Sequence, residues 1–321
     1  MTVLPRFTRK VMIVLLLPAA DGVADRCAER LPRATVLRYE DADRAGLDEV
    51  TFYCLPYMGN ADSIALIKHL PAVKVIQSMS SGVDEVLDAL PPDATLCNGR
   101  DLGHEEGTAD LAATLVLASL RRIPEFVRHQ SQRSWQHVRT HSLRGKQVLL
   151  VGYGAIGAAI EQRLSPFGVQ VARTSRTAKD GVSPLSELPA LAAAADVLVI
   201  CIALSPGTRG LVDASVLAAL PDEALVVNVA RGPVIDPAAL RAELQSGRLR
   251  AALDVADVEP LPAGRPEWSL PNVLITPHIG GDTYDFASRA PSFVADQAAR
   301  HLAGEPLLNV VRGPIGPLSG D

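Results

Sequence analysis

The stretch Val-Leu-Leu-Val-Gly-Tyr-Gly-Ala-Ile-Gly, residues 148–157, decides the fold of this 321-residue chain. Four apolar residues predict a short buried strand, and Gly152, Gly154 and Gly157 follow at once, ahead of a predicted helix over 158–164. The glycines suit a tight turn, a close approach of the backbone to a pyrophosphate, and close packing of helix on strand. The N-terminus of that helix favours a diphosphate. G-x-G-x-x-G alone is a weak signal, but the strand before it and the helix after it predict a dinucleotide-binding fold.

Length and composition indicate an ordinary soluble protein with room for two domains. Hydrophobic residues make up 48% and charged residues 21%. The net charge of -5 gives no excess of positive charge that would indicate nucleic-acid binding. The early apolar run 11–17 is too short to cross a bilayer and lacks a signal-peptide cleavage site. No cysteine pair has metal-ligand spacing, so we expect no metal and read these residues as buried thiols of a reducing compartment. We therefore expect a cytoplasmic protein without membrane partners; the cysteines are Cys27, Cys54, Cys97 and Cys201.

The first hundred residues alternate strand and helix signals, which predicts a small α/β unit. Two of its loops follow strand ends, where open α/β sheets place their ligands. One contains Tyr57 and Met58, and the other contains Ser81, Gly82 and Val83. Each loop, taken alone, is equally well explained as a plain turn.

A long helix predicted over 105–120 is apolar nearly all round, which indicates burial between domains or subunits. The polar and basic stretch 122–142 follows it and contains Trp135. This stretch fits an arm that crosses a partner subunit, or else a solvated helical surface with one anchoring tryptophan.

From Val148 onward, strand and helix signals alternate in a βα pattern rich in Val, Ile and Leu. Such a pattern predicts a doubly wound parallel sheet. We therefore expect an α/β protein of two Rossmann-like domains, each with a doubly wound parallel sheet. The expected dinucleotide-binding domain is 103–285, and the flavodoxin-like substrate-binding domain is discontinuous, formed by 1–102 and 286–321. The strands are predicted at 169–172, 197–203, 224–229, 251–255 and 273–276, with helices at 188–194, 214–220, 237–245 and from 282 to 300.

Three predicted strands end in a reactive residue. These stretches are 228–233 with Arg231, 254–260 with Glu259 and 276–281 with His278. Ends of parallel strands meet at one edge of a sheet, so the three side chains should lie close together. The motifs N-x-A-R-G, L-D-V-x-x-x-E-P and T-P-H, with the glycine loop, resemble the D-isomer-specific 2-hydroxyacid dehydrogenase family. The likeness extends from the Ser-Gly-Val-Asp loop at 81–84 to the Pro-His at 277–278.

The resemblance, within its glyoxylate/hydroxypyruvate reductase-like branch, implies hydride transfer between NAD(P)H and a small 2-oxo acid such as glyoxylate or hydroxypyruvate, by a homodimer. It implies three catalytic residues. Arg231 would hold the substrate carboxylate, His278 would exchange a proton with the carbonyl oxygen, and Glu259 would favour the charged imidazole. Tyr57, Met58, Ser81, Gly82 and Val83, with Arg231, would bind substrate. The cofactor would be bound by Gly152, Tyr153, Gly154, Ala155, Ile156, Gly157, Ser175, Arg176, Thr208, Val229, Ala230, Asp254 and Gly280.

Departures from the family pattern are informative mainly at one place. Ala256 and Ala203 replace an aromatic residue and a proline, and we expect altered packing there without loss of chemistry. Ser175 stands where NAD-selective members carry an acidic residue, with Arg173 and Arg176 beside it. No carboxylate would repel a 2′-phosphate and two guanidiniums could pair with it, so we expect NADP(H) to be preferred over NAD(H). The alternative is a solvated basic turn.

Two other functions fit parts of the pattern. A dinucleotide-binding regulator could keep the fold and lose turnover, although the intact Arg231, Glu259 and His278 argue against this. A formate- or phosphite-type dehydrogenase could use the same framework, although the Tyr57-Met58 loop suits a substrate with a side chain.

Overall fold

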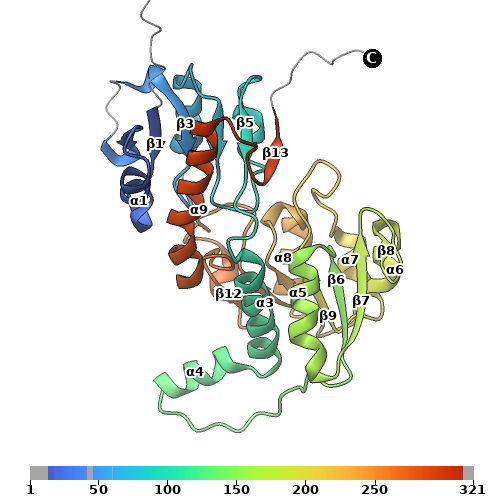
Figure 1. Cartoon of the computed structure of the whole chain (residues 1–321). Coiled ribbons are helices and arrows are strands. Elements are labelled where there is room, and N and C mark those ends of the chain that lie inside the picture. The colour runs from blue at the N-terminus through green and yellow to red at the C-terminus, as the bar shows by residue number, and fades with distance from the viewer. Residues whose placement is uncertain (1–13, 42–45, 60, 314–321) are drawn as a thin grey trace, which may run out of the picture. The chain divides into compact units, whose positions relative to one another are not determined.

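The computed structural model describes residues 14–41, 46–59 and 61–313, and the predicted strand over 11–17 therefore begins outside the described residues. The chain forms two compact units (Figure 1). The first consists of 1–103 with 284–321, and the second of 104–283. Each contains a mainly parallel sheet between helices. The prediction of two α/β domains with doubly wound sheets is confirmed.

The first unit has a six-stranded sheet in the order β13-β5-β4-β3-β1-β2. Five strands are parallel, and β13 runs antiparallel to β5 at the edge. The edge strand β13 was not predicted. The strands are β1 (Val14–Leu17), β2 (Thr35–Arg38), β3 (Val50–Cys54), β4 (Val75–Gln77), β5 (Thr95–Cys97) and β13 (Val310–Arg312).

Alternate residues of these strands enter two separate cores, as the two-residue repeat of a strand requires. Leu15 and Leu17 belong to the core that includes helices α1 (Val23–Arg30) and α9 (Tyr284–Ala303). Leu16 belongs to the opposite core, which includes residues of the helical stretch α2 (Ala61–Ala65) and the 3-10 turn Leu66–His69 that continues it. Both sheet faces are thus covered, which explains why β1 is buried along its whole length.

A buried glutamine joins the chain's C-terminal segment to this sheet. The amide nitrogen of Gln297, on α9, donates to Gln77 Oε1 over 2.8 Å and to the Leu308 carbonyl over 3.0 Å. Its oxygen accepts the Leu308 N–H over 2.9 Å. Every polar atom of the buried Gln297 amide is therefore used, and the contacts hold the segment that leads into β13.

The second unit has a seven-stranded, fully parallel sheet in the order β12-β11-β10-β9-β6-β7-β8. The chain winds outward in opposite directions from β6 and β9, so the switch point lies between these neighbours. The short β8 was not predicted. The strands are β6 (Gln147–Val151), β7 (Gln170–Ser175), β8 (Ser183–Pro184), β9 (Val197–Ile200), β10 (Leu225–Asn228), β11 (Arg250–Leu253) and β12 (Val273–Ile275).

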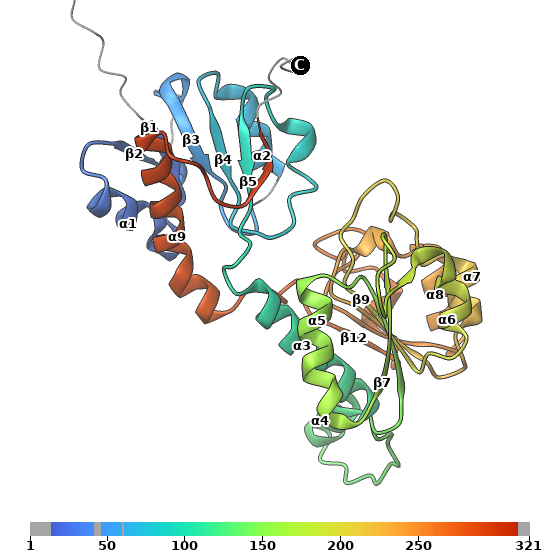
Figure 2. The same ribbon diagram turned by 45° about the vertical axis from the view of Figure 1, so that its right-hand side comes forward.

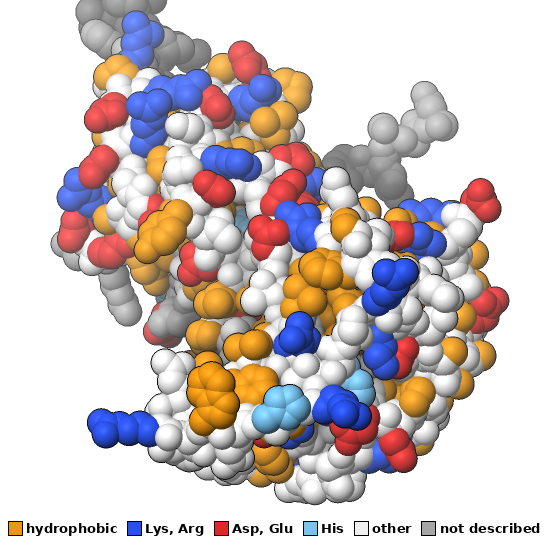
Figure 3. Space-filling model, turned by 90° about the horizontal axis from the view of Figure 1, so that it is seen from below, with side chains coloured by type: hydrophobic (Ala, Val, Ile, Leu, Met, Phe, Trp, Pro, Cys, Tyr) orange, Lys and Arg blue, Asp and Glu red, His pale blue; other side chains and the backbone are white. Residues whose placement is uncertain are grey.

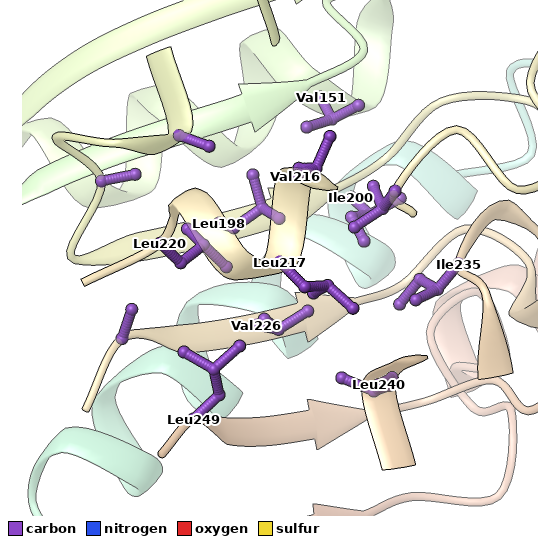
Figure 4. Close-up of a cluster of buried hydrophobic side chains, with 14 of the residues drawn as sticks. Val151, Leu198, Ile200, Val216, Leu217, Leu220, Val226, Ile235, Leu240 and Leu249 are labelled. Atoms are coloured by element: carbon purple, nitrogen blue, oxygen red, sulfur yellow. The ribbon is translucent and has the colours of Figure 1, made fainter. Parts of the chain in front are cut away.

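Helices cover both faces of this sheet (Figure 2). On one face, α3 (His104–Leu120) and α5 (Ala155–Leu164) pack against Val148, Leu150 and their neighbours. On the other lie α6 (Leu188–Ala192), α7 (Ala214–Ala219) and α8 (Pro237–Gln245). Figure 4 shows Leu198, Ile200 and Val226 of the strands among Val216 and Leu217 of α7. In the part of the chain that is described, no helix is long and apolar enough to cross a membrane.

The segment after α3 departs from the compact unit. Helix α4 (Ile123–Ser131) exposes Ile123 and Val127, and the chain continues without helix or strand to β6. Figure 3 shows hydrophobic side chains gathered in patches on this side of the second unit, with basic side chains beside them. Trp135 is 99% exposed. Part of the stretch is an exposed helix, as the second interpretation expected, but Trp135 is not packed against the residues that the structure describes, so its expected anchoring role is wrong.

Candidate active site

The glycine loop follows β6 and requires glycine at two positions. Gly152 has φ +103°, and a Cβ there would lie 2.7 Å from the Ile202 backbone. A Cβ on Gly157 would lie 2.5 Å from the Gly152 carbonyl oxygen, so α5 packs close against the turn. Gly154 is the N-cap of α5, and a Cβ there would meet no atom within 4 Å. The loop therefore leaves open space at the start of α5, which suits a pyrophosphate.

The turn after β9 is closed by a buried threonine. Thr208 Oγ1 donates to the Ala203 carbonyl and accepts the Ser205 N–H, each over 2.8 Å. This side chain is fully buried inside its own turn. Its role in the structure is to shape the loop, and its expected contact with the cofactor stays a prediction.

The loop after β10 presents Arg231, and an asparagine shapes it. Asn228 Oδ1 accepts the Ala230 N–H and Asn228 Nδ2 donates to the Arg231 carbonyl, each over 3.0 Å. Asn228 is buried and Val229 packs into the core. Asn228 was missing from the predicted site, although its place at a strand end, three residues before Arg231, was a usable signal. It holds the backbone from which the guanidinium extends.

Asp254 joins the ends of β11 and β12. Its carboxylate accepts the Thr276 hydroxyl over 2.5 Å and the N–H groups of Ile279 and Gly280 over 3.0 and 2.9 Å. Its carbonyl accepts the His278 N–H over 2.8 Å. The whole turn that carries His278 is thus built on this one buried aspartate. Cofactor binding by Asp254 and Gly280 stays a prediction, since these contacts serve the loop itself.

Glu259 and His278 are in direct contact. Glu259 Oε2 lies 2.6 Å from His278 Nδ1, and Glu259 Oε1 accepts the Ala256 N–H over 3.0 Å. Burial raises the pKa of the Glu259 carboxyl, but the hydrogen bonds from His278 and Ala256 and the charges of His278 and Arg231 outweigh it, so the pKa lies below its ordinary value. The carboxylate is therefore ionised and beside the imidazole.

The backbone around these groups is closely fitted. His278 has φ +56°, an uncommon value for a residue other than glycine, and its N–H bond to Asp254 holds it there. A Cβ on Gly232, directly after Arg231, would overlap the Ala256 carbonyl. The Arg231 loop and the Glu259 loop are therefore in backbone contact, and the structure brings the three predicted catalytic residues together.

The end of β7 carries the residues predicted to select the cofactor. Ser175 Oγ donates to the Thr177 carbonyl over 2.6 Å. Arg176 is exposed and forms no ion pair with any residue that the structure describes. The chain thus offers a hydroxyl and a guanidinium at this position.

Arg173 is engaged elsewhere, which corrects the expectation of two guanidiniums at this end. It forms an ion pair with Glu161 of α5, which also accepts the Tyr153 hydroxyl over 2.7 Å. The Tyr153 ring lies under the Arg173 guanidinium at 5.3 Å and near Lys179 Nζ at 5.6 Å. Lys179 also donates to the Tyr153 carbonyl over 3.4 Å. Sequence reasoning missed Lys179, because it lies in a loop whose path the pattern does not predict.

The residues predicted to bind substrate, apart from Arg231, lie in the first unit. The Tyr57 ring packs on Phe286 with centroids 4.3 Å apart, and Met58 is half exposed with φ +53°. The Ser81 carbonyl accepts Asn98 Nδ2 over 2.9 Å, and Val83 is buried. Substrate binding by Tyr57, Met58, Ser81, Gly82 and Val83 stays a prediction.

Comparison with known proteins identifies the family. Residues 113–280 match the NAD binding domain of D-isomer specific 2-hydroxyacid dehydrogenases. A glyoxylate reductase/hydroxypyruvate reductase of Homo sapiens is 33% identical over 252 residues, which cover 73% of this chain and 76% of the human protein.

Two solved structures resemble the whole fold. One is a D-isomer specific 2-hydroxyacid dehydrogenase from Xanthobacter autotrophicus Py2, in complex with NADPH and MES. It is 33% identical, with a TM-score of 0.75, and the match covers 93% of this chain and 98% of that one. The other, an NADPH-dependent glyoxylate/hydroxypyruvate reductase from Sinorhizobium meliloti, is 29% identical, with a TM-score of 0.79 and coverage of 93% and 97%. This chain therefore belongs to the D-isomer-specific 2-hydroxyacid dehydrogenase family and is an NAD(P)-dependent oxidoreductase of 2-oxo and 2-hydroxy acids.

Proposed function

We propose that this chain is an NADPH-dependent reductase of small 2-oxo acids, with glyoxylate and hydroxypyruvate as its first candidate substrates. The observation that supports the proposal most strongly is the 2.6 Å contact between Glu259 and His278 beside the Arg231 loop. An acid–base group and a cation at one edge of a sheet suit a substrate with both a carbonyl and a carboxylate. The human and Sinorhizobium meliloti relatives carry the names of such reductases.

Each of the three residues has a separate task in the proposed reaction. Arg231 binds the substrate carboxylate through its planar guanidinium and so orients the neighbouring carbonyl. When bound, the reduced nicotinamide supplies the hydride that reaches the carbonyl carbon. His278 gives a proton to the carbonyl oxygen, and the product is the 2-hydroxy acid. Because Nδ1 of His278 faces Glu259, the proton comes from Nε2.

Glu259 acts on the substrate only through His278. Its carboxylate stabilises the imidazolium and fixes the plane of the ring through the contact with Nδ1. In the reverse reaction the same arrangement lets the neutral imidazole accept the hydroxyl proton.

The proposed preference for NADPH depends on the end of β7. The open start of α5 suits the pyrophosphate, and Ser175 leaves no carboxylate to repel a 2′-phosphate. Arg176 is exposed and free of ion pairs among the described residues, so it can pair with the phosphate. In this proposal 104–283 is the dinucleotide-binding domain, and the other unit is the substrate-binding domain.

We also propose that the protein is a cytoplasmic homodimer. Ile123, Val127 and Trp135 are exposed on one segment of the second unit, and a second copy would cover them. The cysteines are unpaired thiols, which suits a reducing compartment. Sedimentation should give twice the chain mass of 34.0 kDa at micromolar concentration; a particle of one chain mass would contradict the dimer.

A substrate panel tests the proposed activity. The purified chain should oxidise NADPH with glyoxylate or hydroxypyruvate, and more slowly oxidise NADH with the same acids. Separate assays of formate and phosphite with NADP⁺ and NAD⁺ test the alternative dehydrogenase functions. Turnover of these alone, or binding of NADPH without turnover of any 2-oxo acid, would contradict the proposal.

A further inference from the structure

Four alternating charges connect the loop after β11 with helix α8. Arg265 Nη2 donates to Asp257 Oδ1 over 2.6 Å and lies 3.4 Å from Glu267 Oε1. Arg241, on α8, donates to the same Glu267 oxygen over 3.1 Å. The Glu267 side chain is only 9% exposed. A buried carboxylate is thus paired with two guanidiniums, one of which holds Asp257.

Asp257 belongs to the turn that orients Glu259. The Ala256 N–H donates to Glu259 Oε1 over 3.0 Å, and the carbonyl of Ala256 begins the peptide that leads into Asp257. The same peptide is in backbone contact with Gly232, next to Arg231. The peptide between Ala256 and Asp257 is therefore held by the Arg231 loop and by the Asp257–Arg265 ion pair. The N–H group of Ala256, which directly precedes this peptide, sets the position of the Glu259 carboxylate.

The arrangement is a poor device for stability alone. The buried Glu267 carboxylate costs desolvation, whereas the side chains of Asp257, Arg265 and Arg241 are 22–28% exposed, and ion pairs with that exposure contribute little to stability. Among the described residues, Glu267 Oε2 and Arg265 Nε are buried without a hydrogen-bond partner. The four charges instead fix the position of the loop after β11, because each ion pair restricts where the loop can lie.

We propose that Arg265, held by Glu267, which also pairs with Arg241, is a positioning residue that fixes the turn of Glu259 through Asp257 and so keeps the carboxylate against His278. This inference rests on the proposed roles of Glu259 and His278. Arg265 takes no part in proton transfer. Its loss lets the turn move, and a displacement of the carboxylate by a fraction of an ångström weakens its hold on the imidazolium.

Three variants test the proposal: Arg265→Gln, Asp257→Asn and the double variant. Each single change should lower kcat for 2-oxo acid reduction by about 3- to 30-fold, with little change in KM for NADPH. The pH profile of kcat should change in the same direction as in Glu259→Gln, because in both cases the carboxylate is no longer held against the imidazole. Arg231, whose charge also lowers the pKa of Glu259, is unchanged in all three variants, so a changed pH profile cannot come from its loss.

Two further variants separate positioning from stability. Arg265→Lys keeps a positive charge within reach of Asp257 and should recover part of kcat. Arg248→Gln is the matched control, because Arg248 is also a partly buried arginine of this unit, paired with Glu243 and bound to the Leu217 and Leu220 carbonyls. This control should lower Tm and leave the pH profile unchanged. The double variant should lower kcat no further than the more damaging single variant, since both single changes break the same Asp257–Arg265 contact.

The proposal is overturned if Arg265→Gln and Asp257→Asn lower Tm without changing kcat or the pH profile, or if their effects multiply in the double variant. Failure of the proposed function is a different result, namely a parent that reduces no 2-oxo acid. The inference is then decided by NMR titration of the His278 imidazole. Its signal is assigned as the one that disappears in His278→Asn. A titration displaced in Arg265→Gln in the same direction as in Glu259→Gln supports it, and an unchanged titration contradicts it.

Discussion

Two regions of the second unit, both at carboxyl ends of its parallel strands, are built in different ways. In the loops after β10, β11 and β12, side chains are held by several partners: Asp254 alone accepts three hydrogen bonds on its carboxylate, and Glu259 is held at both oxygens. At the end of β7, Ser175 makes one hydrogen bond to a carbonyl and Arg176 is exposed. The first region defines positions closely, and the second leaves a charged side chain able to move.

The difference corresponds to the chemistry proposed for each end. Proton transfer requires heavy atoms within about 2.6–3.2 Å and a fixed ring plane, so the site must be built before substrate arrives. A phosphate, in contrast, is recognised by charge over several ångströms, and a mobile guanidinium can follow it. If this comparison is right, changes at the first end should affect kcat strongly, and changes at the second should affect mainly cofactor KM.

The largest effect is expected from removing the His278 imidazole. His278→Gln should lower kcat by about 10²-fold or more, because it removes the proposed proton donor to the carbonyl oxygen. Binding of NADPH, measured by quenching of protein fluorescence, should change little.

The positive φ of His278 calls for a second variant. Asn tolerates φ +56° better than most residues, so His278→Asn removes the imidazole with the least backbone strain. Both variants should lose kcat to a similar extent. Near-normal kcat in either one would remove His278 from the mechanism and, with it, the contrast between the two ends.

The second effect is on cofactor choice. Arg176→Ala should raise KM for NADPH by about 10- to 100-fold, since one charge-assisted bond to phosphate is worth roughly 1.5–3 kcal/mol. KM for NADH should stay nearly the same. Ser175→Asp should reverse the preference, because the new carboxylate repels a 2′-phosphate and can bind a ribose hydroxyl.

Arg144→Ala is the control for this pair, because it removes another exposed guanidinium from the same unit. It should leave both KM values unchanged. A parent enzyme with higher kcat/KM for NADH than for NADPH would show that Arg176 belongs only to a solvated basic turn.

Sequence alone predicted the β–α order of both units apart from the edge strands β8 and β13, since hydrophobic periodicity and strand-end motifs are local properties. Pro237–Gln245 has the predicted bounds, and α3 differs from its prediction only by including His104. Arg231, Glu259 and His278 could be placed together because ends of neighbouring parallel strands converge. Their roles as site residues remain predictions, whereas the fold and family are confirmed.

What the sequence could not predict are contacts between segments far apart in the chain. Nothing local indicates that Glu161 binds Arg173 and so removes one of two expected cations from the end of β7. The pairing of β13 with β5 is equally non-local, and so is the hydrogen bond of Gln297, on α9, with Leu308 in the segment before β13. The network of Arg241, Arg265 and Glu267 also needs the folded loop, since charges near a Glu-Pro dipeptide usually indicate only solvated surface.

The smallest expected effect concerns stability and its dependence on pH. The folded-state pKa of Glu259 lies below the ordinary value of 4.5, so its ionised form stabilises the fold above pH 4.5 and this contribution is lost as pH falls through the lowered value. Glu259→Gln should therefore lower Tm by about 1–3 °C near neutral pH, since a partly exposed pair contributes roughly 1 kcal/mol or less. The difference should narrow below pH 4.5 and should shrink at all pH values in a His278→Asn background, because the imidazole is the main group that lowers this pKa. Scanning calorimetry of the four proteins from pH 3.5 to 7 measures both trends. A Tm difference that is the same across that range would mean that Glu259 shapes the loop without exchanging charge with His278, and the catalytic end would then differ from the end of β7 in rigidity alone.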